Sequence, residues 1–234
     1  MDSPAAPGSW QVGELEGPAA ELHAVDLIAR GGRRVWMLEP AAAALVVGSA
    51  QSLDDVRADA AAAAGVDVVR RRSGGGAVLV APGRQVWVDV VIDRDDLLWD
   101  DDVGRATWWV GEWWCQALAA LGVRAEMHRG PWERTPWSTR YCFAGRGAGE
   151  LSVGDRKLVG ISQRRTRLGC RFQCVAPVRF DGAALCELVV PPPGAESACA
   201  SVLAGAACGL VDLVESAAPD LSGQMRSALL AALP

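Results

Sequence analysis

The single lysine of the chain lies in a glycine-bounded segment that could place a positive charge against a ligand. Lys and Arg together occupy 23 of the 234 positions, and only Lys157 is a lysine. Its segment reads Gly154-Asp-Arg-Lys157-Leu-Val-Gly160-Ile-Ser162-Gln-Arg-Arg165. A lysine ammonium is a compact point charge on a flexible stem, whereas an arginine guanidinium is a wider planar fork. A single lysine among arginines therefore indicates a narrow site that needs the smaller cation. The alternative interpretation is that Lys157 has no functional role.

A glycine-rich segment is the second feature that could bind a charged group. It reads Arg70-Arg71-Arg-Ser73-Gly74-Gly75-Gly76-Ala77-Val. Three successive glycines permit positive φ and bring backbone N–H groups close to a ligand, and such groups form anion-binding nests. Arginines at the edge can clamp a phosphate or a carboxylate. The segment matches neither the Walker nor the Rossmann glycine pattern, so a hairpin turn beside solvated arginines is the alternative.

The seven cysteines offer thiol chemistry but no metal-binding pattern. Their odd number and the absence of an export signal favour free thiols in a reducing cytoplasm over a disulfide framework. Only two histidines are present, and neither lies near a cysteine pair at zinc spacing. We therefore expect no metal site.

The overall composition predicts a soluble globular protein. Hydrophobic residues make up 50% of the chain and charged residues 22%, which is not a disordered composition. The formal net charge of −5 argues against nucleic-acid binding through general electrostatics. No run of 18 apolar residues is present, so no membrane span is expected. We expect a cytoplasmic protein without membrane or nucleic-acid partners.

Hydrophobic periodicity predicts helices and strands that mix along one domain, residues 1–234. Residues 1–15 are expected to form a loose arm and residues 195–234 a helical tail interrupted near Pro219. The other expected helices cover residues 18–30, 54–64 and 102–121. Expected strands cover residues 34–39, 44–48, 66–70, 77–80, 85–92, 123–127, 150–153, 157–162 and 171–179.

Two of these elements carry further expectations. Partial alternation in residues 85–92 indicates a strand with one exposed face. The helix of residues 102–121 carries four tryptophans: Trp108, Trp109, Trp113 and Trp114. Their spacing favours a core seam; the alternative is a lipophilic wall for an acyl chain.

Taken together, the two segments resemble the biotin/lipoate protein ligase superfamily, and within it the branch of lipoate–protein ligases and octanoyltransferases. The glycine segment is followed about eighty residues later by Gly-x-x-Lys157-x-x-Gly160-x-Ser162-Gln. An early strand, Ala44-Leu-Val-Val-Gly48-x-x-Gln, is also similar to that branch. The resemblance spans roughly residues 45–165. It implies a single α+β domain with a central mixed, largely antiparallel sheet flanked by helices.

The resemblance also implies an enzyme that attaches a lipoyl or octanoyl group to a lysine of a lipoyl-carrier domain. Such carriers are the E2 subunits of oxo-acid dehydrogenases and the H protein of glycine cleavage. Lys157 would contact the acyl carbonyl or the phosphate of lipoyl-AMP, where a fixed ammonium stabilises negative charge that develops on oxygen. The substrate or adenylate would be bound by Arg70, Arg71, Ser73, Gly74, Gly75, Gly76, Ala77, Gly160 and Ser162.

Departures from the ligase pattern give Cys142 a role in a second route. Residues 141–144, Tyr-Cys-Phe-Ala, stand where ligases carry an Asn-Asp pair for adenylate and magnesium. Cys142-Phe is similar to the Cys-Phe segment of one octanoyltransferase group, whose cysteine carries the acyl chain as a thioester. A thiolate is the attacking form, and the neighbouring cations Arg140, Arg146 and Lys157 would favour it. The alternative is a buried, inert thiol.

Two mechanisms and one non-catalytic role stay open. The first expectation is a ligase that uses ATP and Mg²⁺ and passes through lipoyl-AMP. The second is ATP-independent transfer of octanoyl from acyl-carrier protein through Cys142, which needs no cofactor. The absence of the Asn-Asp pair at residues 141–144 also fits a non-catalytic lipoate-binding module or half of a bipartite ligase. A biotin ligase fits less well because its Gly-Arg-Gly-Arg loop is absent.

Overall fold

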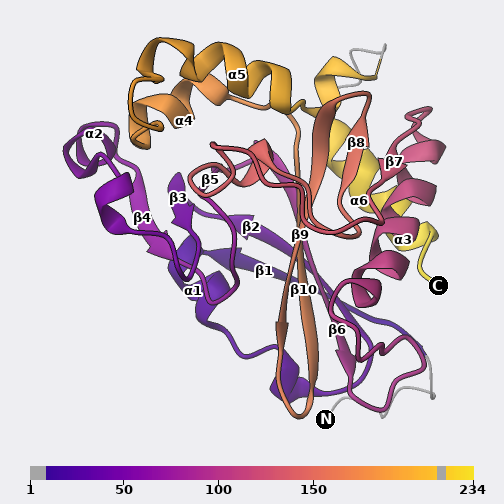
Figure 1. Cartoon of the computed structure of the whole chain (residues 1–234). Helices are drawn as coiled ribbons and strands as arrows, with labels where there is room; N and C mark the ends of the chain where they lie inside the picture. The colour runs from indigo at the N-terminus through magenta and orange to yellow at the C-terminus, as the bar shows by residue number, and fades with distance from the viewer. Residues whose placement is uncertain (1–8, 215–219) are drawn as a thin grey trace.

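The computed structural model describes residues 9–214 and 220–234, and its centre is a seven-stranded sheet (Figure 1). The strand order is β1-β2-β6-β10-β9-β8-β7. Only β1 and β2 pair in parallel, and every other neighbouring pair is antiparallel. This confirms the predicted α+β fold. The strands are β1 (Gln11–Gly17), β2 (Arg34–Pro40), β6 (Gln85–Asp93), β7 (Glu126–Met127), β8 (Leu151–Val153), β9 (Arg156–Arg165) and β10 (Gly169–Pro177).

A second sheet of three short strands carries the glycine segment. Its central strand β3 (Ala44–Val47) pairs in parallel with β4 (Asp67–Arg70) and antiparallel with β5 (Val78–Val80). The glycine turn, residues 71–77, connects β4 to β5 across β3. It is therefore not a hairpin turn, because the strands on its two sides do not pair with each other. Both of its ends are fixed by the same small sheet.

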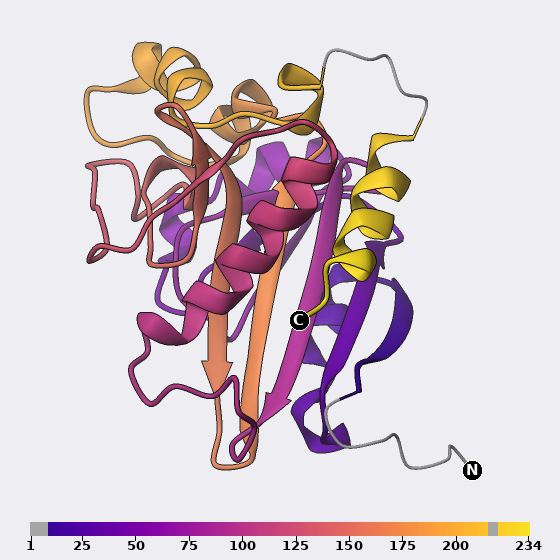
Figure 2. The same cartoon turned by 90° about the vertical axis from the view of Figure 1, so that its right-hand side faces the viewer.

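Two helices cover one face of the large sheet (Figure 2). They are α3 (Trp108–Ala120) and α6 (Leu221–Ala231). Trp113 and Trp114 of α3 are buried in this core, and Trp113 Nε1 donates to the carbonyl of Leu229 in α6 at 2.8 Å. None of the four tryptophans predicted on this helix lines the main cavity described below. The core-seam interpretation is therefore the one that fits.

The other face of the large sheet is also covered, which corrects the expectation for β6. Val86, Val88 and Val90 face the core under α3 and α6, whereas Trp87 and Val91 pack in a second core with α1 (Ala19–Ala24) and the small sheet. The strand is buried on both faces, so the partial alternation seen in the sequence did not mark a solvent face. A strand buried on both faces has no polar side to alternate with.

The remaining helices pack against the small sheet in a third core. They are α2 (Ala58–Ala63), α4 (Gly182–Leu188) and α5 (Cys199–Ala206). A disulfide joins Cys186 of α4 to Cys199 of α5, with the two Cα atoms 6.0 Å apart. The expectation that all cysteines are free is therefore wrong for this pair. Short 3-10 turns lie at η1 (Ile28–Arg30), η2 (Leu53–Asp55), η3 (Arg105–Thr107), η4 (Cys142–Ala144), η5 (Glu196–Ala198) and η6 (Leu210–Asp212).

The ends of the chain differ from the prediction in two places. Residues 11–17, most of which were expected in a loose arm, form the edge strand β1 against β2. The single helix expected over residues 18–30 divides into α1 and η1. The interruption expected near Pro219 lies outside the described residues.

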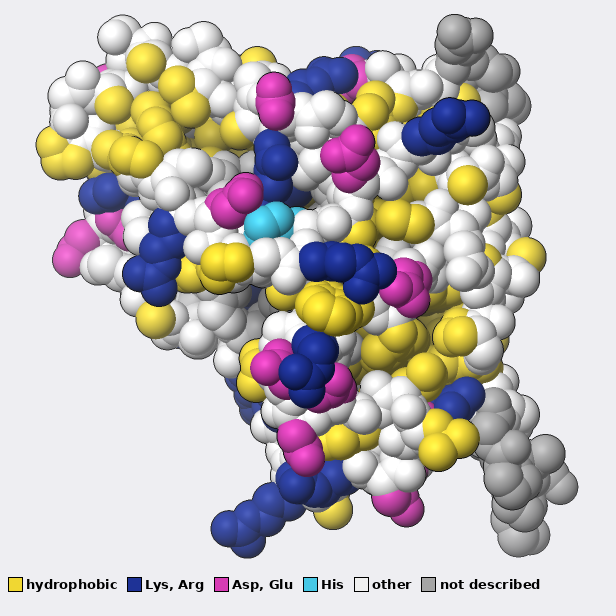
Figure 3. All heavy atoms as spheres, turned by 45° about the vertical axis from the view of Figure 1, so that its right-hand side comes forward, with side chains coloured by type: hydrophobic (Ala, Val, Ile, Leu, Met, Phe, Trp, Pro, Cys, Tyr) yellow, Lys and Arg dark blue, Asp and Glu magenta, His cyan; other side chains and the backbone are white. Residues whose placement is uncertain are grey.

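Two surface properties complete the description. No helix in the described part of the chain combines the length and the hydropathy that a membrane crossing requires. On the face shown in Figure 3, basic and acidic side chains are interspersed and do not gather into a patch of one sign.

Candidate functional site

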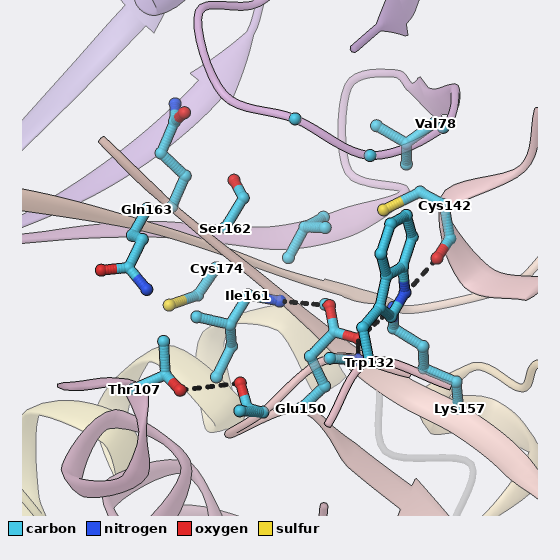
Figure 4. Close-up of a pocket in the computed structure, with 18 of the residues that line it drawn as sticks. Val78, Thr107, Trp132, Cys142, Glu150, Lys157, Ile161, Ser162, Gln163 and Cys174 are labelled. Carbon is cyan, nitrogen blue, oxygen red and sulfur yellow. Dashed lines mark hydrogen bonds and ion pairs between the residues drawn. The ribbon is translucent and has the colours of Figure 1, made fainter. Parts of the chain in front are cut away.

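The glycine turn and the lysine-bearing strand meet at one cavity of about 500 Å³ (Figure 4). The turn is at one wall, β9 and β10 form another, and residues 128–150 supply loops that close the space. Of the residues predicted from the sequence, those that line this cavity are Arg71, Gly74, Gly75, Gly76, Cys142, Lys157, Gly160 and Ser162. Arg70, Ser73 and Ala77 are not part of the lining. Segments more than eighty residues apart in the sequence therefore form a single site.

Lys157 is a buried, fixed charge within this wall. Its side chain is 2% exposed, and Nζ lies 2.6 Å from Glu150 Oε2. The same nitrogen donates to the carbonyl oxygens of Cys142 and Gly145, each at 2.9 Å. An ammonium has three N–H donors, so all three are used. Lys157 is thus not a solvent-exposed lysine without a role, because its hydrogen bonds hold the turn that carries Cys142.

Glu150 is a site residue that the sequence reasoning missed. Its Oε1 accepts from the backbone N–H of Ile161 at 3.0 Å, and its Oε2 accepts from that of Gly147 at 2.6 Å. Together with the ion pair to Lys157, these hydrogen bonds compensate the desolvation cost of a carboxylate that is almost completely buried. A sequence signal did exist, because a lone buried lysine needs an acidic partner and Glu150 lies just before its hairpin.

The two arginines predicted to clamp a phosphate have different partners in the structure. Arg70 donates to the carbonyl oxygens of Gly48, Ser49 and Gln51 at 2.8–3.1 Å, outside the cavity. Arg71 donates to the carbonyl oxygens of Gly74 and Gly76 at 2.8 and 2.9 Å and is 5% exposed. Nη1 of Arg70 and the guanidinium of Arg71 thus donate to main-chain acceptors. Their structural effect is to shape the glycine turn.

Close backbone packing explains why parts of this turn must be glycine. A Cβ on Gly76 would lie 2.6 Å from the backbone nitrogen of Tyr141, and one on Gly48 would lie 1.8 Å from the carbonyl oxygen of Gly75. Ala77 continues the contact, because its N–H donates to the Arg140 carbonyl at 2.7 Å. The glycine turn and the Cys142 turn are therefore in direct backbone contact.

We expect Gly76→Ala to destabilise the protein by about 1–3 kcal/mol, because the added methyl overlaps immobile backbone. Gly74→Ala is the matched control, since no atom lies within 4 Å of a Cβ at that position. Urea unfolding of both variants measures the difference. Equal stability of the two variants would show that the turn does not pack as described.

Cys142 presents its thiol to the cavity beside the glycine turn. Its Sγ lies 4.0 Å from Nη2 of Arg71 and 3.9 Å from the Cβ position of Gly75. The cation nearest to the thiol is thus Arg71, whereas Lys157 contacts the carbonyl of Cys142 and not its sulfur. Burial raises the pKa of two other thiols, that of Cys170 to about 12 and that of Cys174 as well.

A hydrogen-bonded chain of uncharged side chains lines another part of the cavity. Ser162 Oγ donates to Ser73 Oγ at 3.0 Å, and Ser73 Oγ donates to Gln173 Oε1 at 3.0 Å. Gln173 Nε2 lies 3.2 Å from Nδ1 of His23, whose ring packs on Trp87 with centroids 4.6 Å apart. Ser73 is thus linked to the site through its neighbours, although it does not line the cavity.

Lowering the pH from 7.5 to 5 is expected to destabilise the fold through His23 by about 2 kcal/mol. Burial, and then the positive charges of Arg171 and Arg71, lower the pKa of His23 from 6.5 to about 3. Below pH 6.5 the unfolded chain binds a proton at this histidine that the folded chain does not, so stability falls with pH. Urea unfolding at both pH values should show a smaller acid loss for His23→Leu. Equal losses would contradict a neutral, buried ring.

The profile of the lipoyl protein ligase A/B catalytic domain matches residues 21–222. The chain belongs to this family. The match covers the glycine turn, Cys142, Lys157 and every strand except β1, and it confirms the resemblance found in the sequence. Among proteins with curated functions, no sequence relative was found.

Solved structures of lipoyl ligases share the fold. One is a bipartite lipoate protein ligase from Thermoplasma acidophilum, with a TM-score of 0.74 and 18% identity over 95% of this chain and 81% of that one. A putative lipoate protein ligase from T. acidophilum with bound lipoic acid has a TM-score of 0.71 and 16% identity over 97% and 84%. A lipoate–protein ligase A bound with ATP has a TM-score of 0.66 and 17% identity over 95% and 83%. At these identities the likeness concerns the fold.

The side chains that the sequence assigned to a phosphate have partners within the protein in this structure. Nη1 of Arg70 and Nη2 of Arg71 donate to carbonyl oxygens, and the three N–H groups of Lys157 are also paired. Within residues 9–214 and 220–234, no group of three or more His, Cys, Asp or Glu side chains could hold a metal ion. Cys142 and Cys174 bring thiols to the cavity wall.

Proposed function

We propose that this protein attaches a lipoyl or octanoyl group to a lysine of a lipoyl-carrier domain. The observation that carries the proposal is the convergence of Lys157, the glycine turn and the Cys142 thiol at one cavity. The remainder of its wall is largely apolar and includes Val78, Val80 and Val175. Such a cavity suits an acyl chain whose reactive carbonyl lies at the charged end. Membership of the lipoyl ligase family supports the same reaction class.

We further propose that the acyl group passes through a thioester on Cys142. The thiolate attacks the thioester carbonyl of an acyl-carrier protein, a new C–S bond forms, and the carrier thiolate leaves. The neutral amine of the acceptor lysine then attacks, the C–S bond to Cys142 breaks, and an amide forms while the amine proton is released. Nη2 of Arg71 lies 4.0 Å from Sγ and contacts the sulfur that gains and loses the acyl group.

A ligase that acts through lipoyl-AMP is the second candidate. It is favoured by the shared fold with the ligases described above, one of which is bound with ATP and one of which was determined together with an E2 lipoyl domain. The carrier partner would be an E2 lipoyl domain or a glycine-cleavage H protein in either case. The two routes differ only in the donor and in the need for Cys142.

The function is tested by incubating the full-length protein with an E2 lipoyl domain and two alternative donors. One reaction contains octanoyl-acyl-carrier protein, and the other contains lipoate, ATP and Mg²⁺. We expect the intact mass of the lipoyl domain to rise by one octanoyl group in the first reaction without ATP. A rise only in the second would establish the ligase route. Binding of lipoate without any mass change in either reaction would indicate a non-catalytic module.

A further inference from the structure

The cavity has an uncharged polar end that lies away from Lys157. Ser162, Gln173 and His23 are parts of its wall. Lys157 and Ser162 both lie on β9, and a separation of five residues corresponds to about 16 Å along a strand. Figure 4 shows Ser162 across the pocket from Cys142 and Lys157. A ligand whose reactive carbonyl lies near Lys157 therefore extends toward this polar end.

The amide of Gln173 sets the direction of the hydrogen bonds at this end. Its Oε1 accepts from Ser73 Oγ at 3.0 Å, so its Nε2 is the donor that remains. The same Nε2 faces Nδ1 of His23 at 3.2 Å. Because an amide nitrogen donates, Nδ1 accepts, and the ring hydrogen of His23 is on Nε2.

The donor on His23 Nε2 is fixed and has no partner within the described residues. Arg171 donates to the carbonyl oxygens of Leu22 and Val25 at 2.8 and 2.9 Å, on both sides of His23 in sequence, and so anchors its segment. The ring is also packed on Trp87. Its depressed pKa keeps it neutral at physiological pH. The polar end of the cavity thus offers one oriented, uncharged N–H donor.

We propose that this polar end is a subsite for a hydrogen-bond acceptor at the far end of the acyl group, with His23 Nε2 as its donor. The inference rests on the proposed acyl-transfer function and concerns which acyl group is used. A saturated octanoyl chain would leave a buried donor unpaired, which is unfavourable. A medium-chain acyl group that ends in a hydroxyl or carbonyl oxygen would pair with it. The dithiolane sulfurs of a lipoyl group are weaker acceptors than oxygen. A lipoyl group should therefore bind with an affinity between those of the octanoyl and the oxygen-terminated groups.

Isothermal titration of the full chain with octanoate, lipoate and 8-hydroxyoctanoate tests the subsite. We expect the wild type to bind 8-hydroxyoctanoate about tenfold more tightly than octanoate. His23→Leu removes the donor and should abolish or reverse this preference. Cys115→Ser is the control, because Cys115 lies on α3 and does not line the cavity, and it should retain the wild-type ratio. Equal affinities in the wild type, or an unchanged ratio in His23→Leu, would overturn the subsite.

A measurement on the wild type alone covers the case in which His23→Leu fails to fold. Nitrogen-15 spectra of the histidine rings should show His23 in the Nε2–H form, without titration between pH 5 and 8. A ring that titrates near its ordinary pKa, or carries its hydrogen on Nδ1, would contradict the proposal. Transfer of octanoyl and 8-hydroxyoctanoyl at equal rates would refute the subsite and leave the proposed function intact. Absence of both transfer and acid binding would refute the proposed function as well.

Discussion

Replacing Lys157 with methionine is expected to lower kcat for acyl transfer by about 10²-fold, the cost of a small misplacement of a reacting group. The ammonium lies in the cavity wall and holds the carbonyl oxygens of Cys142 and Gly145. Its loss removes the fixed positive charge and releases the turn that carries the thiol. Steady-state transfer to a lipoyl domain measures the effect.

The same substitution also leaves Glu150 buried without its cation, so a loss of about 3–5 kcal/mol in unfolding free energy is expected. The double variant Lys157→Met/Glu150→Gln separates stability from activity, because it removes both charges together. Most of the stability should return, whereas kcat should stay low. A single variant with near-normal kcat, or a double variant that regains activity with stability, would show that Lys157 has only a structural role.

Cys142→Ser is expected to reduce octanoyl transfer from acyl-carrier protein by at least about 10³-fold, as removal of a covalent nucleophile does. The serine hydroxyl lacks the ready ionisation of a thiol and forms no thioester. Intact-mass spectra of the protein with octanoyl-acyl-carrier protein should show an octanoyl adduct on the wild type and none on the variant.

Cys115→Ser provides the control for this experiment. Cys115 is likewise a partly exposed free cysteine, but it lies on α3 and does not line the cavity. It should retain both the adduct and the rate. If Cys142→Ser transfers lipoyl groups normally with lipoate and ATP, the thioester route is wrong and the adenylate route replaces it.

The sequence was sufficient to predict which segments form the site. A lone lysine and three successive glycines are unusual enough to be recognised locally, and together they indicated the family and hence the α+β fold. Cys142 was singled out because Cys142-Phe is similar to the Cys-Phe segment of one octanoyltransferase group. These residues could be found because each belongs to a short motif whose residue types are required by local geometry.

The partners of those residues could not be predicted, because they come from distant parts of the chain. Arg71 was assigned to a ligand, yet its acceptors are carbonyl oxygens that only the folded turn brings into reach. His23 and Gln173 meet across 150 positions of sequence, and no local pattern marks either. The edge strand β1 was also missed, since its alternate residues are exposed and its pairing with β2 depends on the tertiary fold.

A crystal structure of the protein with a bound medium-chain acid tests the account most directly. We predict that the carboxyl end lies between the glycine turn and Lys157, close to Cys142 Sγ, and that the chain follows β9 toward Ser162. An acid bound outside this cavity, or with its carboxyl end at Ser162 and its tail at Lys157, would contradict the account.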